Sequence, residues 1–227
     1  MIRRRVFWLI TLFALLAVTL PYVWAAYRSD GQLVFGGFLM NLADGNSYLA
    51  KMQQGWHGEW RFRLPFTAEP GQGAYLFGFY LFLGHVARWL GLPLLIVFHA
   101  ARLTAAVVLL VVLRRFYETI LAGNRRAAEW AWSVAVLGGG LGWLVAFGGG
   151  PLTADFWVAE TYPFLSMYAN PHFPLGLACM VAFLNLMLRG SRAWAWMAVL
   201  GLITGVVLPF GVVVMVVVGG VIMIWRW

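Results

Sequence analysis

Acidic side chains are few in this chain of 227 residues, and most of them lie in two polar segments. Asp44, Glu59 and Glu69 belong to the first segment, and Asp155 and Glu160 belong to the second. A carboxylate held beside a hydroxyl group can accept its proton while a new bond forms, which is general base catalysis. These five acids are therefore the first candidates for catalytic residues.

Asp44 is the strongest candidate, because it lies in a polar stretch, residues 41–60, that follows an apolar run. Its alternative role is structural, since an Asp before Gly-Asn-Ser can cap a helix that begins near Asn46. Glu59 is typical of a solvated surface charge. Glu69 can face a site or can equally be a solvated loop acid.

The second segment contains residues of the types that bind metal ions. Asp155 and Glu160 are five residues apart, and His172 precedes the next apolar run. Two carboxylates and an imidazole can hold Mg²⁺ or Mn²⁺, but this spacing is not specific. The alternative is that His172 closes the first turn of a helix and that both acids are solvated. No motif requires a cofactor, and Mg or Mn is the one that these residues could hold.

Arg102 lies in the middle of an apolar run. Placing an arginine near the centre of a membrane costs roughly 2.5 to 3.5 kcal/mol on insertion scales, so a partner must offset the cost. His99 lies one turn earlier and shares its helix face. The partner is either an anionic ligand in an interior cavity or an acid from a loop of the same bundle.

Composition places these residues in an integral membrane protein. Apolar residues make up 63% of the chain, charged residues make up 11%, and the mean hydropathy is +0.82. The apolar runs are continuous, which predicts helices rather than a membrane β-barrel. The net charge of +8 does not indicate nucleic-acid binding, because the basic residues lie at the ends of apolar runs. Cys179 stands alone, which excludes a disulfide within the chain and indicates a packing role.

The arginines predict the topology. Arginines next to the first Met place the N-terminus in the cytoplasm by the positive-inside rule. If residues 74–90 and 94–113 both crossed, six later arginines would face the outside, whereas all six lie inside if only 94–113 crosses. These six are Arg114, Arg115, Arg125, Arg126, Arg189 and Arg192. We therefore expect residues 74–90 to form a juxtamembrane or re-entrant helix in the first outer loop.

We expect an all-α polytopic protein with about six crossing helices in one transmembrane domain, residues 1–227. Pro209 and Gly211 divide the last apolar run into two spans of about 16 residues. The outer loops then cover residues 28–93 and 148–172. The N-terminal run is typical of an uncleaved anchor, and a chain that ends after an apolar run indicates truncation at the C-terminus. The expected crossing ranges are 6–26, 94–113, 130–147, 173–188 and the two halves of 193–225.

Several short motifs resemble a known superfamily. Asp44 and Tyr48 are followed by a Gly-x-x-Gly-x-Trp run that ends at Trp60. Thr-Ala-Glu-Pro then surrounds Glu69, and the second loop reads DFWVAETYPFLSMYANPHF. This order resembles the GT-C superfamily, polytopic glycosyltransferases that use polyprenyl-phosphate-linked sugars, and above all its bacterial members. Such proteins generally have more crossing helices, which again indicates a fragment.

The resemblance implies a membrane glycosyltransferase at the outer face of a bacterial cytoplasmic membrane. Asp44 would be the base of an inverting transfer, and Tyr48 and Trp60 would stack on sugar faces. Arg102 would pair with the lipid phosphate. Glu69 and His172 would add substrate contacts, and Asp155 and Glu160 would hold the metal if there is one. The implied partners are a lipid-phosphate-linked sugar donor, an acceptor and membrane lipids, and no nucleic acid.

Two other classes stay open. A transporter or channel would use Arg102 and His99 to line a path, and it should carry polar residues in several crossing helices at similar depth. The other apolar runs offer few such residues, which favours an enzyme at the interface. A non-catalytic, truncated membrane protein is the third class.

Overall fold

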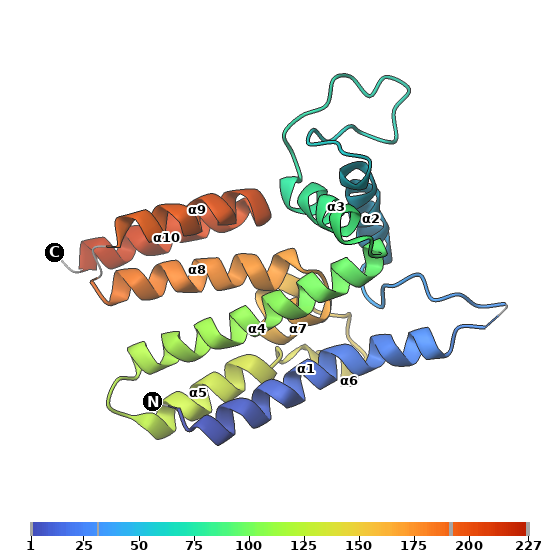
Figure 1. Cartoon of the computed structure of the whole chain (residues 1–227). Helices are drawn as coiled ribbons and strands as arrows, with labels where there is room; N and C mark the ends of the chain where they lie inside the picture. The colour runs from blue at the N-terminus through green and yellow to red at the C-terminus, as the bar shows by residue number, and fades with distance from the viewer. Residues whose placement is uncertain (1, 31, 191–192, 226–227) are drawn as a thin grey trace.

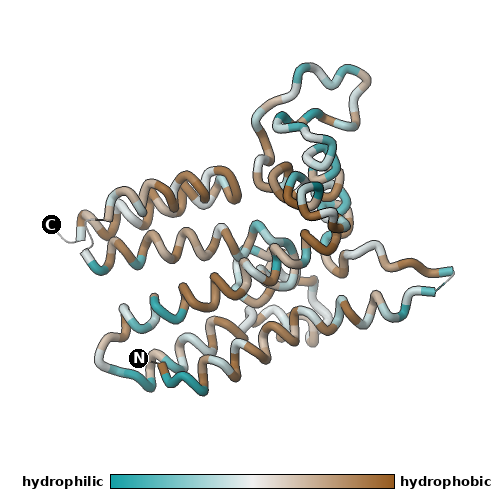
Figure 2. The backbone as a smooth tube through the Cα atoms, viewed as in Figure 1, coloured by the Kyte–Doolittle hydropathy of each residue, from teal (hydrophilic) through white to brown (hydrophobic). Residues whose placement is uncertain are grey.

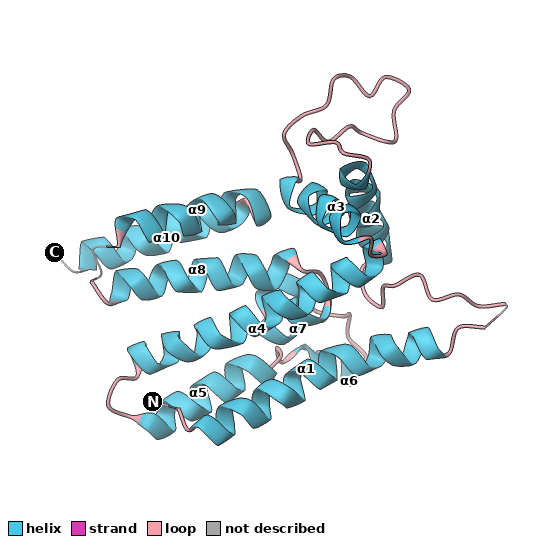
Figure 3. Cartoon of the chain, in the orientation of Figure 1, coloured by secondary structure: helices cyan, strands magenta, loops and turns pink. Residues whose placement is uncertain are grey.

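The structure, a computed structural model, describes residues 2–30, 32–190 and 193–225. Figure 1 shows that its long helices run side by side and that a smaller helical unit lies at one end of them. Within the described ranges no β-strand occurs, and the one isolated β-bridge joins Phe62 and Ala74. Figure 3 shows the same arrangement as helices and connecting loops. The expected all-α class is confirmed.

Six helices form the bundle. Helix α4 packs against α1, α5 and α8, and α8 packs against α9 and α10. The core between α1, α4 and α5 centres on Trp132, which is fully buried and donates its indole N–H to the carbonyl oxygen of Leu110 over 3.3 Å. The bundle helices are α1 (Arg4–Tyr27), α4 (Leu94–Ile120), α5 (Arg125–Leu137), α8 (His172–Leu188), α9 (Trp194–Val207) and α10 (Phe210–Trp225).

Two of these helices are long and apolar enough to cross a membrane. Helices α1 and α4 have 24 and 27 residues, and at about 1.5 Å per residue each exceeds the roughly 30 Å of a hydrocarbon core. Helices α8, α9 and α10 are apolar but shorter, with 17, 14 and 16 residues. Figure 2 shows hydrophobic residues along the bundle helices. These two helices indicate membrane association.

The prediction of one continuous crossing helix over residues 130–147 is wrong. Residues 130–147 do not form a single helix, because α5 ends at Leu137 and a separate helix, α6 (Gly142–Phe147), follows. Glycine is a poor helix former, and three glycines in succession begin at Gly138, whose backbone is extended. The division of the last apolar run is confirmed, since α9 ends before Pro209 and α10 begins after it.

A pair of shorter helices carries the first polar segment. Helix α2 (Leu42–Trp56) packs closely on α3 (Gly78–Leu90). The two backbones touch at glycines: a Cβ added at Gly55 would collide with the carbonyl of Leu81, and one added at Gly84 with that of Met52. The expected helix over 74–90 starts only at Gly78. In Figure 1 this pair lies at the end of the bundle away from both chain termini.

The opposite end of the bundle carries several arginines. Arg3 and Arg125 both form ion pairs with Glu129, and Arg114 pairs with Glu118 over 3.1 Å. The backbone N–H of Ile2 also donates to the Glu118 carboxylate. Hydrophilic residues therefore mark this end of α1, α4 and α5 in Figure 2. These contacts connect the start of α1 to the α4–α5 turn.

Candidate functional site

One face of α2 carries several polar side chains. Ser47 and Tyr48 lie three and four residues after Asp44, and Lys51 lies four and three residues after them, so all four project from the same side of the helix. This face is turned toward α3 and the start of α8, because Tyr48 contacts both Tyr80 and His172. The face joins the predicted base to aromatic and cationic groups.

Lys51 is the cationic group within this face. Its side chain is buried, with 6% of the residue exposed. The ammonium donates a hydrogen bond to Ser47 Oγ over 2.7 Å and lies 4.3 Å from the ring centre of Phe77 and 4.9 Å from that of Tyr48. Burial lowers its pKa, and the Asp44 carboxylate opposes that shift. Among the described residues no carboxylate lies within ion-pair distance of Lys51.

Two tyrosines and a histidine pack together beneath the polar face of α2. The rings of Tyr48 and Tyr80 stack with centroids 4.2 Å apart and an interplanar angle of 7°. The Tyr80 hydroxyl forms a buried hydrogen bond of 2.6 Å with Nδ1 of His172, the first residue of α8. Helices α2, α3 and α8 therefore meet at this point. Burial also raises the pKa of Tyr80 well above its ordinary value.

Asp44 and Glu160 both lie near Tyr48. The pKa of the Tyr48 phenol is raised to about 12, mainly by burial and also by the negative charges of Asp44 and Glu160. Glu160 belongs to η2 (Ala159–Thr161), a short 3₁₀ turn that packs on α8. The two polar segments of the sequence therefore meet at Tyr48.

Asp44 itself is exposed in the first turn of α2. The alternative that it caps a helix beginning near Asn46 is wrong, because α2 begins at Leu42 and Asn41 is the N-cap. Asn41 adopts a left-handed backbone with φ of 50° and makes no side-chain capping bond. An acid in the first helical turn is favoured by the helix dipole, and its carboxylate stays open to solvent.

Asp155 has a local structural role. Its carboxylate accepts a hydrogen bond from the backbone N–H of Gly142 over 2.8 Å and another from the Thr153 hydroxyl. The Thr153 bond is the main cause that lowers the pKa of Asp155. These bonds tie η1 (Ala154–Phe156) to the start of α6. Across the described residues no group of three His, Cys, Asp or Glu side chains could hold a metal ion. Metal binding by Asp155 and Glu160 stays a prediction.

Arg102 lies at a junction of three helices and is only 1% exposed. Its Nη1 atom donates to the carbonyl oxygens of Val18 in α1 and of Met167 and Tyr168 in α7 (Pro163–Tyr168), over 3.0, 2.9 and 3.2 Å. Its guanidinium carbon lies 4.3 Å from the ring centre of Tyr22. Carbonyl groups therefore take the place of the loop acid expected as its partner, and the phosphate role stays a prediction.

Trp60 and Glu69 lie outside the Tyr48 cluster. Trp60 is 51% exposed, stacks on His85 with ring centroids 3.9 Å apart, and borders a pocket of about 600 Å³ that Phe77 and Pro209 also line. Phe77 lines this pocket, and its ring also contacts the Lys51 ammonium. Glu69 is exposed on the loop between α2 and α3, where its backbone N–H bonds to the Thr67 hydroxyl.

The comparisons with known proteins add no relative. No model of a protein family, no curated protein and no solved structure matches this chain. The candidate site is therefore described by its own geometry.

Three site residues were not predicted from the sequence. Lys51 and Tyr80 are described above, and Asn170 lies two residues before His172. Asn170 is fully buried, and neither its Nδ2 nor its Oδ1 atom has a hydrogen-bond partner within the described structure. The seven-residue spacing from Asp44 to Lys51 is a sequence signal that points to Lys51, because it places both on one helix face.

Proposed function

We propose that this chain is a membrane glycosyltransferase that moves a sugar from a polyprenyl-phosphate donor to an acceptor at the outer face of the membrane. The supporting observation is the α2 face, where an open carboxylate, an aromatic ring and a buried cation follow each other as Asp44, Tyr48 and Lys51. A base, a sugar-stacking surface and a countercharge for phosphate are what such a transfer needs.

The chemical step follows from these groups. The acceptor hydroxyl oxygen attacks the anomeric carbon while the bond from that carbon to the phosphate oxygen breaks. The electron pair leaves with the polyprenyl phosphate, the hydroxyl proton passes to Asp44, and the configuration inverts. Tyr48 provides an aromatic face beside Asp44, and Trp60 provides a second one at the neighbouring pocket.

Lys51 is the cation best suited to the departing phosphate. An ammonium that is buried without a carboxylate partner in the described part of the chain carries an unbalanced positive charge, which an anionic group would neutralise. Arg102 is less suited, because three carbonyl oxygens already accept hydrogen bonds from its Nη1 atom.

The proposed membrane placement has six crossing segments and a cytoplasmic N-terminus. The crossings are α1, α4, the α5–α6 segment, α8, α9 and α10. Large apolar side chains are exposed on these elements, as with Leu9, Val108 and Val216, and a lipid phase would cover them. The arginine-bearing helix ends would then face the cytoplasm, and α2 and α3 would lie at the outer surface.

Transfer activity is the test of this proposal. The full chain, reconstituted in vesicles, would be given a polyprenyl-phosphate-linked labelled sugar in one arm and a nucleotide-linked sugar in the other. Because the acceptor is unidentified, release of the leaving group is the readout, free polyprenyl phosphate in the first arm and free nucleotide in the second, with water or an added glycoside as acceptor. Release from the lipid-linked donor alone supports the proposal. Release from the nucleotide donor alone, or from neither, contradicts it.

A further inference from the structure

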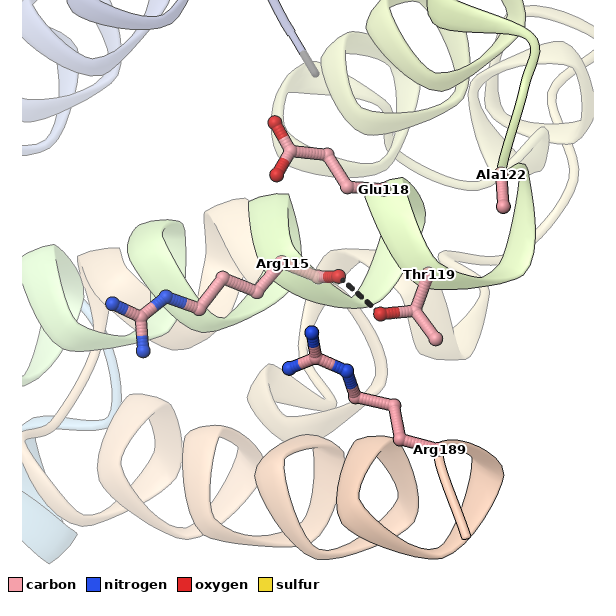
Figure 4. A pocket seen from close by; sticks show the side chains of 5 residues that line it. All are labelled: Arg115, Glu118, Thr119, Ala122 and Arg189. Carbon is pink, nitrogen blue, oxygen red and sulfur yellow. Dashed lines mark hydrogen bonds between the residues drawn. The ribbon is translucent and has the colours of Figure 1, made fainter. Parts of the chain in front are cut away.

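A pocket at the arginine-rich end lies between the last turns of α4 and α8. Figure 4 shows this pocket, which has a volume of about 540 Å³ and is lined by Arg115, Glu118, Thr119, Ala122 and Arg189. Arg115 extends along α4, and Arg189 reaches from the end of α8 toward α4, so both guanidinium groups border the space between the two helices. The C-terminal ends of α4 and α8, whose residues line the pocket, lie at the end of the molecule opposite to α2 and α3.

The two arginines carry charge that the protein does not balance. Glu118 is the acid of the pocket, but its carboxylate already accepts hydrogen bonds from Arg114 Nε over 3.1 Å and from the backbone N–H of Ile2 over 2.7 Å. Thr119 donates its hydroxyl to the Arg115 carbonyl oxygen. In the described part of the chain neither Arg115 nor Arg189 forms an ion pair, and both are exposed.

Two guanidinium groups on facing helices are suited to one phosphate group. Each planar guanidinium can donate two parallel hydrogen bonds to phosphate oxygens, and its charge is never lost by deprotonation. Basic pockets between membrane helices on the cytoplasmic side bind anionic lipid headgroups. The partial negative charge at the helix C-termini explains why single arginines are favoured here, but it does not explain a shared pocket between two helices.

We propose that Arg115 and Arg189 form a binding site for the phosphate of an anionic phospholipid at the inner surface of the membrane. Helix α4 is long enough to cross the bilayer, so its end lies at headgroup depth if it does so. Exposed apolar side chains on α4, such as Val107, Val108 and Ile120, can then lie beside the acyl chains. The inference uses the membrane placement proposed above and is independent of sugar transfer.

Lipid retention tests this site. The full chain would be purified in detergent with phosphatidylglycerol or with phosphatidylcholine, and bound lipid would be counted by native mass spectrometry. The wild-type protein should retain phosphatidylglycerol preferentially. The double variant Arg115→Gln/Arg189→Gln should lose about thirtyfold in affinity, because each basic residue near an anionic surface contributes about a factor of five. Equal retention of both lipids, or unchanged retention by the double variant, would overturn the proposal.

Matched variants separate binding from folding and lipid from free phosphate. Arg61→Gln/Arg63→Gln removes the same charge at the other end of the molecule and should leave retention unchanged; an equal loss there would mean that net charge alone attracts the lipid. Arg115→Lys/Arg189→Lys keeps the charge and should retain part of the binding, even if the Gln variant unfolds.

Inorganic phosphate should not displace the lipid, and complete displacement would identify a free-phosphate site instead. Loss of transfer activity plays no part in this test.

Discussion

The hydroxyl of Tyr80 and Nδ1 of His172 lie 2.6 Å apart in a buried hydrogen bond that ties α3 to the start of α8. Because Tyr48 stacks on Tyr80, this bond also fixes the α2 face that carries Asp44. The α2–α3 pair is therefore joined to the bundle through a polar contact as well as through its apolar core around Phe98.

Removing the Tyr80 hydroxyl should destabilise this junction. Tyr80→Phe leaves a buried ring nitrogen of His172 without its partner, which costs about 1 to 3 kcal/mol. We expect denaturant titration of the protein in mixed micelles to show this decrease in the free energy of unfolding. Tyr75→Phe, which alters an exposed phenol, should cost nothing measurable. Equal stability of the two variants would show that the Tyr80–His172 bond does not hold the helices together.

Arg102→Lys should also destabilise the fold. The lysine keeps the charge but cannot reproduce the guanidinium contacts with Val18, Met167 and Tyr168, so we expect a loss of about 2 to 4 kcal/mol. Arg88→Lys, at an exposed position of α3, is the matched control. If Arg102→Lys proved as stable as wild type but failed to bind the lipid-linked donor, the phosphate role of Arg102 would replace the structural one.

The α2–α3 contact depends on glycine. In Gly84→Ala the new methyl group would meet the Met52 carbonyl, and moving two backbones apart should lower the thermal midpoint by several degrees, as overpacking costs about 1 to 3 kcal/mol. Gly201→Ala in α9 meets nothing within 4 Å and should be neutral or slightly stabilising. The same midpoint for both variants would rule out close packing of α2 on α3.

The Tyr48 phenol should ionise late in an alkaline titration. Its pKa is raised from 10.0 to about 12 by burial and by the Asp44 and Glu160 carboxylates. A raised pKa in the folded state stabilises the protein fully below pH 10, and this contribution disappears as the pH rises toward 12. Tyrosinate absorbance should therefore show a late step whose amplitude Tyr48→Phe reduces.

Asp44→Asn provides the second readout of that titration. Removing the carboxylate charge should move the late step to lower pH, because one cause of the raised pKa is lost. A late step that does not move would show that solvent screens the exposed Asp44 carboxylate from the Tyr48 phenol.

The sequence predicted most helices because long apolar runs bounded by charges have few other solutions. It failed at residues 130–147, where the high hydropathy of the flanking residues masks the break that begins at Gly138. The start of α2 was also misplaced, since Asn41 enters the helix through a left-handed backbone without a side-chain cap. Local backbone geometry of this kind leaves little trace in composition or periodicity.

The site was predicted in part. Asp44, Glu160 and His172 were candidates from residue type, Tyr48 was one from the resemblance to the GT-C superfamily, and the structure places the first three near Tyr48. The partners of Arg102 could not be predicted, because Val18 and Met167 are 84 and 65 residues away in sequence and contribute only backbone oxygens, which every residue has.

Turnover of Asp44→Asn tests the central claim most directly. Asparagine preserves the shape of the side chain but cannot accept the acceptor proton, so transfer from a polyprenyl-phosphate-linked sugar should fall by roughly a hundredfold to ten-thousandfold. Glu59→Gln, an equal change in the same polar segment, should keep wild-type turnover, and both variants should keep the wild-type thermal midpoint. Wild-type turnover in Asp44→Asn would contradict the assignment of Asp44 as the base.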